Sequence, residues 1–315
     1  MNSPISQLSD KATRLYVTGG TGFVGGHVAK LVAEGVFGSC ELIAASHGLD
    51  IRDAKAVKEE LSEVKPDQVI HLAARSFVPA SFVEPQDTFE VNLFGTLNIL
   101  EALKELKFSG RMLYISSGDV YGAVPEEALP VDESRPPAPR SPYAVSKVSA
   151  ELLCKQYHLS AGLDVIVVRP FNHIGPGQHE QFVVPGFAKQ VARIAQGLQP
   201  PIIEVGDIDV TRDFCDVRDV VRAYAMLLRS GRAGELYNVA SGNETTVRDI
   251  LERLCALVGV TPEIVQDASR LRPSEQRRMV ASAKKLTDDT GWRPAISLDS
   301  SLQQILETFR TKVTQ

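Results

Sequence analysis

The stretch Leu15-Tyr16-Val17-Thr18-Gly19-Gly20-Thr21-Gly22-Phe23-Val24-Gly25 decides the fold of this chain. An apolar, β-prone run leads into a glycine-rich turn and then directly into a helical pattern. Glycine permits a tight turn and lets backbone N–H groups approach a pyrophosphate, and the helix N-terminus adds partial positive charge. A turn that merely connects strand and helix would leave the glycine cluster unexplained. The stretch therefore predicts a dinucleotide site contacted by Gly19, Gly22, Phe23, Val24 and Gly25.

The alternation of strand and helix continues through the first half of the chain. Further β-rich runs fall at 41–44, 68–70, 112–115 and 165–168, with helical patterns at 25–34, 53–64, 85–106 and 142–160. This rhythm predicts an α/β fold with a doubly wound parallel (Rossmann) sheet, covered by helices on both faces. We expect the dinucleotide-binding domain to span 12–170, joined by parts of 213–240. After residue 182 the pattern of helix, a short strand at 202–205 and more helix predicts that 171–315 form mainly a smaller, substrate-binding C-terminal lobe.

Composition excludes several classes of protein. The chain has 315 residues, is 43% hydrophobic and carries a net charge of only −5, without the basic stripe that nucleic-acid binding requires. No apolar run approaches a membrane span of about 20 residues, and the polar stretch 1–11 has no apolar signal core. We expect a cytoplasmic protein with no nucleic-acid, membrane or metal partner. Its four cysteines are scattered and show neither metal-ligand spacing nor a disulfide framework: Cys40, Cys154, Cys215 and Cys255.

The end of the second strand bears on the choice of coenzyme. An acidic residue there would bind the ribose 2′-hydroxyl of NAD, but the chain has Ala45-Ser46-His47. Without a carboxylate to repel a 2′-phosphate, NADP is favoured, with Ser46 and His47 as donors. No arginine is present, so the use of NAD also stays open. Asp50 and Ile51 follow at a place suited to the adenine, although Asp50 fits a helix N-cap equally well.

A tyrosine and a lysine are placed one helical turn apart near the middle of the chain. Ser141 fits an N-cap and Pro142 the first helical position, which puts Tyr143 and Lys147 on the same helix face. An ammonium near a phenol favours the phenolate and would let Tyr143 act as an acid or base near neutral pH. An isolated Tyr-x-x-x-Lys is common on helix surfaces, so this pattern needs further support.

That support comes from the strand at 112–115, which ends in Ser116-Ser117. Hydroxyl groups at the carboxyl end of a parallel strand face the binding crevice. We expect Ser117 to hold a substrate carbonyl oxygen while Tyr143 protonates it. Ser116 is equally well explained as a residue that caps the strand.

With these motifs in this order, the chain resembles the extended short-chain dehydrogenase/reductase family over nearly its whole length. The matching features are the glycine spacing, Ser117, Tyr143-x-x-x-Lys147 and Gly291-Trp292-Arg293-Pro294. Within that family it looks like the enzymes of GDP-deoxysugar synthesis, through the stretches 169–173, 181–183, 211–213 and 272–275. The resemblance implies two further groups of contacts. The residues near the coenzyme would be Leu72, Ala73, Ala74 and His173, together with Tyr143 and Lys147. The residues that contact the nucleotide sugar would be Ser117, Asn172, Val183, Lys189, Arg212, Arg272 and Glu275.

The residues after Ser117 separate two activities within this resemblance. Sugar-nucleotide 4,6-dehydratases carry an acidic or hydroxyl residue and then a glutamate there, whereas this chain has Gly118 and Asp119. The resemblance thus implies reduction, not dehydration. The expected reaction is NADPH-dependent reduction of the C4 ketone of GDP-4-keto-6-deoxy-D-mannose to GDP-D-rhamnose. A GDP-mannose 4,6-dehydratase, another nucleotide-sugar epimerase or dehydratase, and a non-enzymatic redox sensor are the alternatives.

Members of the family commonly form homodimers by pairing the helix that carries Tyr143 with the helix before it. We expect the same assembly here. Ordinary packing against the sheet explains the candidate apolar residues equally well: Leu93, Leu97, Leu100, Leu152 and Leu153.

Overall fold

Six parallel strands form the central sheet of the computed structural model, which describes residues 12–267 and 276–312. The strand order is β2-β1-β3-β4-β5-β9, so the predicted doubly wound α/β fold is confirmed. Because β2 and β3 flank β1, the order reverses at β1, and ligands in such folds bind at the carboxyl ends beside that point. The strands are β1 (Thr13–Thr18), β2 (Cys40–Ala44), β3 (Gln68–His71), β4 (Arg111–Ile115), β5 (Asp164–Pro170) and β9 (Leu236–Val239).

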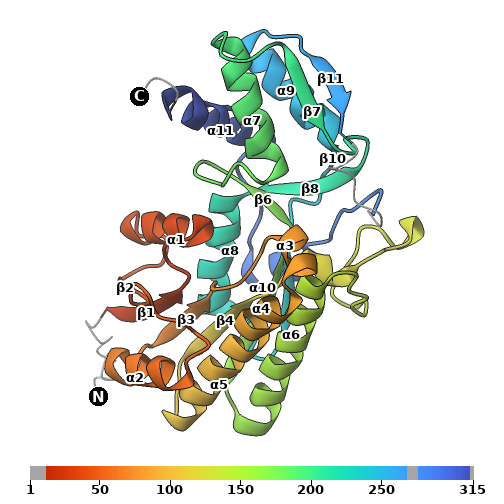
Figure 1. Cartoon of the computed structure of the whole chain (residues 1–315). Helices are drawn as coiled ribbons and strands as arrows, with labels where there is room; N and C mark the ends of the chain where they lie inside the picture. The colour runs from red at the N-terminus through yellow and green to blue at the C-terminus, as the bar shows by residue number, and fades with distance from the viewer. Residues whose placement is uncertain (1–11, 268–275, 313–315) are drawn as a thin grey trace, which may run out of the picture.

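Helices cover both faces of the sheet (Figure 1). Alternate residues of a strand point to opposite faces, so Leu15 and Val17 pack in one core and Tyr16 in the other. The first core includes helices α1 (Phe23–Ala33), α8 (Val217–Ser230) and α10 (Lys284–Thr290). The second includes α2 (Ala54–Val64), α5 (Gly95–Glu105) and α6 (Pro142–Ala161).

The helix expected at 85–106 runs without a gap from Pro85 to Glu105, with a π-helical turn inside it. It consists of α4 (Pro85–Phe89), a π-helical turn at Glu90–Phe94 and α5, and a short helix α3 (Val78–Val83) precedes it. In the π turn Asn92 is buried: its Oδ1 accepts from the Arg75 backbone N–H at 2.7 Å, and its Nδ2 donates to Ser146 Oγ at 2.9 Å. A π turn is typical of functional sites, and this one ties the loop after β3 to the helix that carries Tyr143.

The lobe has a core of its own and lies above the carboxyl ends of the strands in Figure 1. Of its strands, only the one at 202–205 was predicted from the sequence. Among the described residues, no helix combines the length and apolar character needed to cross a bilayer. The lobe contains helices α7 (Val183–Ala195), α9 (Val247–Val258) and α11 (Leu298–Lys312), the pair β7 (Ile202–Val205) and β11 (Glu263–Gln266), and the sheet of β6 (Asn172–Ile174), β8 (Thr211–Asp216) and β10 (Glu244–Thr246).

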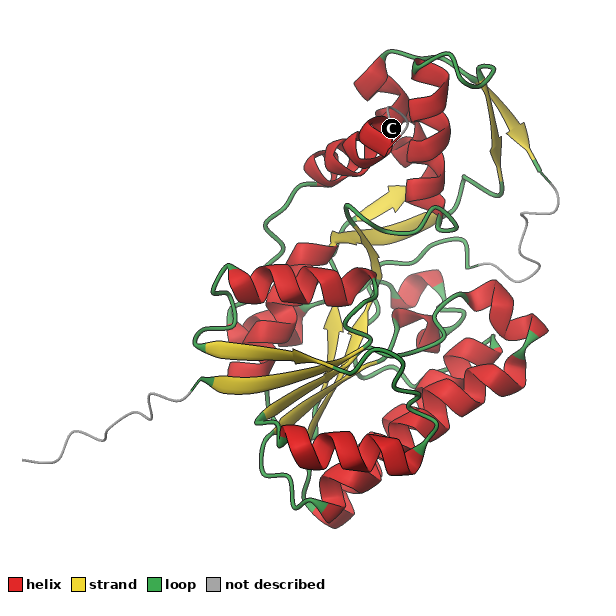
Figure 2. Cartoon of the chain, turned by 60° about the vertical axis from the view of Figure 1, so that its left-hand side comes forward, coloured by secondary structure: helices red, strands yellow, loops and turns green. Residues whose placement is uncertain are grey.

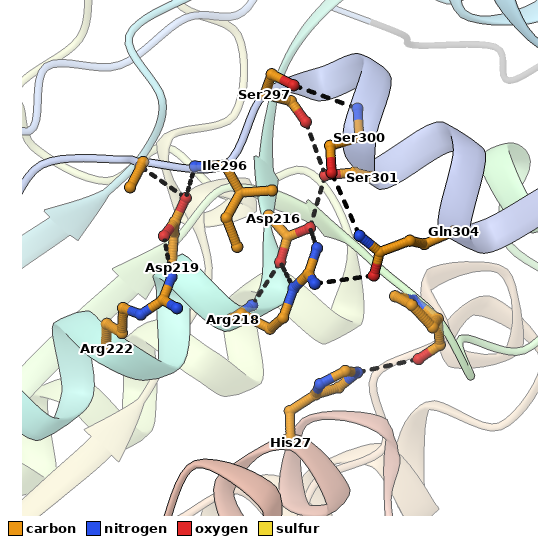
Figure 3. Close-up of polar contacts among 12 residues, drawn as sticks. His27, Asp216, Arg218, Asp219, Arg222, Ile296, Ser297, Ser300, Ser301 and Gln304 are labelled. Carbon is orange, nitrogen blue, oxygen red and sulfur yellow. Dashed lines mark hydrogen bonds and ion pairs between the residues drawn. The ribbon is translucent and has the colours of Figure 1, made fainter. Parts of the chain in front are cut away.

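After β11 the chain packs against the sheet layer with α10 and then re-enters the lobe as α11, where Figure 2 marks the C-terminus. Trp292 is buried in the core beneath α8, and its Nε1 donates to the Asp219 carbonyl at 2.9 Å. Figure 3 shows Asp216 and Asp219 between α8 and the segment that leads into α11. Asp219 accepts from the Ile296 backbone N–H at 2.8 Å, and Asp216 accepts from the Ser301 hydroxyl at 2.6 Å. These carboxylates hold the start of α11 against the sheet layer.

Candidate active site

The glycine turn between β1 and α1 is tightly packed. Gly19 has a φ of +69°, and a Cβ atom there would lie 2.8 Å from the backbone nitrogen of Ala73. A Cβ atom at Gly25 would lie 2.5 Å from the carbonyl oxygen of Gly20. The helix begins at Phe23, so its N-terminus opens beside this turn. A cradle of backbone at a helix N-terminus fits the pyrophosphate of a dinucleotide.

Two residues expected to contact the coenzyme lie together beside the turn. The rings of Phe23 and His173 are parallel, with centroids 6.1 Å apart. His173 Nδ1 hydrogen-bonds with the carbonyl oxygen of Phe171 at 3.0 Å. Burial lowers the pKa of His173, so this imidazole is neutral at pH 7. Leu72, Ala73 and Ala74, which follow β3 directly, are partly buried on the other side of the turn.

The end of β2 presents Ser46 and His47 to solvent. Asp50 is not the N-cap of α2, because it pairs with Arg52 at 2.7 Å, while Asp53 accepts the capping hydrogen bonds. Ile51 is only 6% exposed and belongs to the core shared with α2 and α5. The accessible polar groups predicted at this edge are therefore Ser46, His47 and Asp50.

The structure brings Ser117 and Tyr143 together. Ser117 caps a short 3-10 turn, since its Oγ accepts from the Asp119 backbone N–H at 3.1 Å, and its side chain lies near enough to the Tyr143 phenol to lower the pKa of that phenol. Ser141 is the predicted N-cap of α6, and its Oγ accepts from the Ala144 backbone N–H at 3.1 Å. This cap and the end of β4 place the Ser117 hydroxyl and the Tyr143 phenol near each other.

Electrostatics at Tyr143 differ from the expectation. Burial raises the pKa of the Tyr143 phenol, the carboxylate of Asp119 raises it further, and the nearby Ser117 hydroxyl opposes both. The expected lowering by Lys147 was wrong, because Lys147 Nζ donates to the carbonyl oxygen of Ile115, at 2.7 Å. The phenol is therefore protonated near neutral pH, as a proton donor must be, and its proton can leave readily only when a nearby positive charge stabilises the phenolate.

Lys147 lies in a buried polar layer beneath the crevice. Its Nζ is 5.2 Å from the centre of the Tyr114 ring, and burial lowers the pKa of Lys147 to about 8 against the opposing effect of Glu151. Glu151 is paired with Arg169 at 2.6 Å and accepts a hydrogen bond from the hydroxyl of Ser116. Ser116 thus has a structural role, which was one of the two interpretations of its sequence position.

His71, at the end of β3, was missed by the sequence analysis. Its Nδ1 hydrogen-bonds with Thr18 at 2.6 Å and its Nε2 with Thr96 at 3.0 Å, which links β1 to α5. Burial, and then the charge of Lys147, lowers the pKa of His71 to about 3. The only signal in the sequence is a histidine that ends an apolar strand. Among the described residues, no group of histidine, cysteine or acidic side chains could hold a metal ion.

Three of the residues expected to contact substrate lie at the start of the lobe. Asn172 is exposed at the start of β6, and Val183 is exposed as the first residue of α7. Lys189 pairs with Glu180 at 2.7 Å. Lys189 also lines an open hollow of about 600 Å³ together with Glu180, Gly186, Gln190, Arg193, Gln199, Pro200, Ile202 and Glu204.

The remaining substrate candidates lie on β8 and on the segment after β11. Arg212 donates from its guanidinium to the carbonyl oxygens of Thr211, at 2.7 Å, and Gln276, at 2.8 Å. These bonds hold Arg212 against the backbone of Gln276, which precedes α10 in the chain. Arg272 and Glu275 lie outside the described residues.

A doubly wound sheet, a packed glycine turn and the set of Ser117, Tyr143 and Lys147 define a short-chain dehydrogenase/reductase of the extended type. Residues 38–305 match the model of a family described as GDP-mannose 4,6 dehydratase. The chain belongs to that family.

Relatives within this class carry out related reactions. The chain is 49% identical to the GDP-6-deoxy-D-mannose reductase of Pseudomonas aeruginosa, over 96% of this chain and 99% of the relative. It is 30% identical to a dTDP-glucose 4,6-dehydratase of Xanthomonas campestris, over 95% and 93% of the two chains. A solved structure of RMD from Pseudomonas aeruginosa complexed with NADPH has a TM-score of 0.89 and 48% identity, and the match covers 96% of this chain and all of that one.

Proposed function

We propose that the chain reduces the C4 ketone of GDP-4-keto-6-deoxy-D-mannose with NADPH, forming GDP-D-rhamnose. The observation that carries this proposal is the placement of the Ser117 hydroxyl beside a protonated Tyr143 phenol, with Gly118 next in the chain. Such a pair can hold and protonate a carbonyl oxygen. The similarity to a GDP-6-deoxy-D-mannose reductase, and to a structure with NADPH, supports the same substrate and coenzyme.

In the proposed mechanism the side chains act on one oxygen atom. Ser117 donates a hydrogen bond to the C4 carbonyl oxygen and polarises it. The bound nicotinamide supplies the hydride. Tyr143 donates its phenolic proton to the same oxygen, and its raised pKa keeps that proton in place until negative charge develops there. Lys147 would hold the coenzyme ribose, and its positive charge would stabilise the phenolate left on Tyr143.

The surroundings of Gly118 favour reduction over dehydration. Elimination of water needs a group that transfers a proton at this position, and glycine has none. A Cβ atom at Gly118 would lie 2.9 Å from the Phe171 ring, so this ring fills the space that a longer side chain would use. Asp119 is exposed, and its backbone N–H is bound to Ser117. These contacts support a crevice built for hydride and proton transfer to a ketone.

The two parts of the chain would divide the binding work. We assign the coenzyme to residues 12–170 with α8 and β9, and the nucleotide sugar mainly to the rest of 171–315. Arginine suits diphosphate because its planar fork bonds two oxygens at once. The proposed substrate contacts are Ser117, Asn172, Val183, Lys189, Arg212, Arg272 and Glu275.

We assign a homodimer to the exposed face of α6. Val145, Leu152 and Leu159 are spaced seven residues apart on this helix and are 37%, 64% and 73% exposed. Phe94, on the neighbouring π turn, is 52% exposed. Of the five leucines considered from the sequence, Leu152 is exposed, whereas Leu93, Leu97, Leu100 and Leu153 pack in the core beneath α5 and α6. An apolar stripe of this kind suits pairing with the same stripe of a second copy.

We place the protein in the cytoplasm. All four cysteines are free thiols, and three of them are buried. Unpaired cysteines fit a reducing compartment.

The test of the proposed function is to offer GDP-4-keto-6-deoxymannose with NADPH, follow the loss of reduced nicotinamide and identify the sugar product. We expect one coenzyme consumed per GDP-D-rhamnose formed. The variant Tyr143→Phe should lower kcat by roughly a hundredfold or more, since it removes the proton donor, and should still bind NADPH. Conversion of GDP-mannose to the keto-sugar without consumption of coenzyme would instead identify a dehydratase.

A further inference from the structure

A carboxylate reaches the end of β2 from outside the strand. Glu60, on α2, accepts a hydrogen bond from the backbone N–H of Ser46 at 3.0 Å and another from the hydroxyl of Tyr16 at 2.7 Å. Both bonds are to the same oxygen, Oε1. Tyr16 is fully buried in β1, and burial raises the pKa of its phenol. The carboxylate of Glu60 is thus held at a fixed position.

That position matters for the coenzyme. In doubly wound folds the residue at the end of the second strand meets the 2′ position of the adenosine ribose. Here β2 ends at Ala44, and Ser46 is the second residue after it. No acidic residue of this strand end occupies the position, yet Glu60 supplies a negative charge at the Ser46 backbone.

Resting on the proposed function, we infer that Glu60 limits the preference of this enzyme for NADPH over NADH. The 2′-phosphate carries up to two negative charges, and a carboxylate held close to it repels it. NADH has a neutral 2′-hydroxyl, which this charge does not repel. The end of β2 has no acidic residue of its own to disfavour NADPH relative to NADH. Helix α2 supplies that carboxylate from another part of the sequence.

The size of the effect depends on solvent. Glu60 is partly exposed, so salt screens its charge, with a Debye length of about 8 Å at physiological ionic strength. A carboxylate and a phosphate a few ångströms apart at a protein surface still repel each other measurably. We therefore expect a change in coenzyme preference that is about tenfold at low salt and smaller at high salt.

The test measures binding directly. Isothermal titration calorimetry with NADP⁺ and with NAD⁺ gives the two Kd values for the intact chain, for Glu60→Gln and for Glu63→Gln. Glutamine can accept both hydrogen bonds of Glu60, so the first variant should fold, which thermal unfolding checks. Glu63 lies exposed on the same helix, and its replacement removes the same charge while leaving the bonds of Glu60 to Tyr16 and Ser46 intact.

In Glu60→Gln the ratio of Kd for NAD⁺ to Kd for NADP⁺ should rise about tenfold, mainly through tighter binding of NADP⁺. It should stay within about twofold in Glu63→Gln, and the difference should shrink as NaCl is added. Equal ratios in the two variants would remove Glu60 from coenzyme selection while leaving the reductase proposal intact. An unmodified chain that binds neither coenzyme would overturn both proposals.

Discussion

Lys147 is held against the carbonyl oxygen of Ile115 in surroundings that lower its pKa to about 8. Above that pH the amine loses its proton and no longer stabilises negative charge on Tyr143. We therefore predict that kcat/KM for reduction falls as pH rises through about 8. In Lys147→Arg the decline should move to higher pH, because the guanidinium stays protonated. A decline at the same pH in both proteins would assign it to another group; the measurement is the pH profile of initial rates.

His71 makes stability dependent on pH. Its pKa is lowered from 6.5 to about 3 in the folded chain. Between these values the unfolded chain binds a proton that the folded chain does not, so stability is complete above about pH 6.5 and falls as pH falls. At pH 5 the loss from this group is roughly 2 kcal/mol. Urea unfolding at pH 7 and pH 5 measures it, and His71→Gln should show a smaller difference. An equal difference in both proteins would contradict the assignment.

Residue roles that depend on local sequence could be predicted, whereas those that depend on tertiary contacts could not. The cap at Ser141 and the pairing of Ser117 with Tyr143 could be predicted, because strand ends and helix starts have sequence signals. Glu60 could not, since its role depends on the packing of α2 against β1 and the end of β2. The pKa shift of Tyr143 was predicted in the wrong direction, because spacing along a helix does not report burial.

Among the elements, the turn between β1 and α1 provides a matched pair of glycines. Gly25→Ala places a Cβ atom 2.5 Å from the Gly20 carbonyl oxygen, whereas a Cβ atom at Gly26 meets nothing within 4 Å. The first change should displace the turn, cost about 1–3 kcal/mol of unfolding free energy and weaken NADPH binding. Gly26→Ala should add about 0.5–1 kcal/mol through helix propensity. Denaturant unfolding and coenzyme titration of both variants check this, and similar behaviour of the two would refute it.

Five of the six sheet strands were predicted to within about two residues at each end, since buried parallel strands are continuous apolar runs. No strand was predicted for β9, and in the lobe only the strand at 202–205 was. Strands β6 and β10 are short and are defined by pairing with β8, not by a pattern of their own. The π turn at Glu90–Phe94 also lacks a signal, because Asn92 is turned inward by contacts with Arg75 and Ser146, far away in the sequence.

For the whole molecule, the stripe on α6 predicts assembly. We expect the unmodified chain to sediment as a dimer and Leu152→Glu to sediment as a monomer, because the change places charge in the centre of an apolar interface. Leu257→Glu is the control, since Leu257 is also exposed, at 44%, but lies on α9 in the lobe. Sedimentation velocity measures the outcome. A monomeric unmodified chain, or a dimeric Leu152→Glu variant, would exclude this interface.

The return of the chain beneath α8 limits how enzymes of this kind can be recombined. A chimera that took all of 171–315 from a relative would also replace α8, β9 and α10, and with them the partners of α1 and β5 in the sheet. A chimera that kept α8 but took α11 from a relative would instead have to preserve the bonds that Asp216 and Asp219 make to Ser301 and Ile296. A single splice after β5 would separate strands from the helices that cover them. Transplanting a new sugar specificity therefore requires several crossover points, or individual replacements around the crevice.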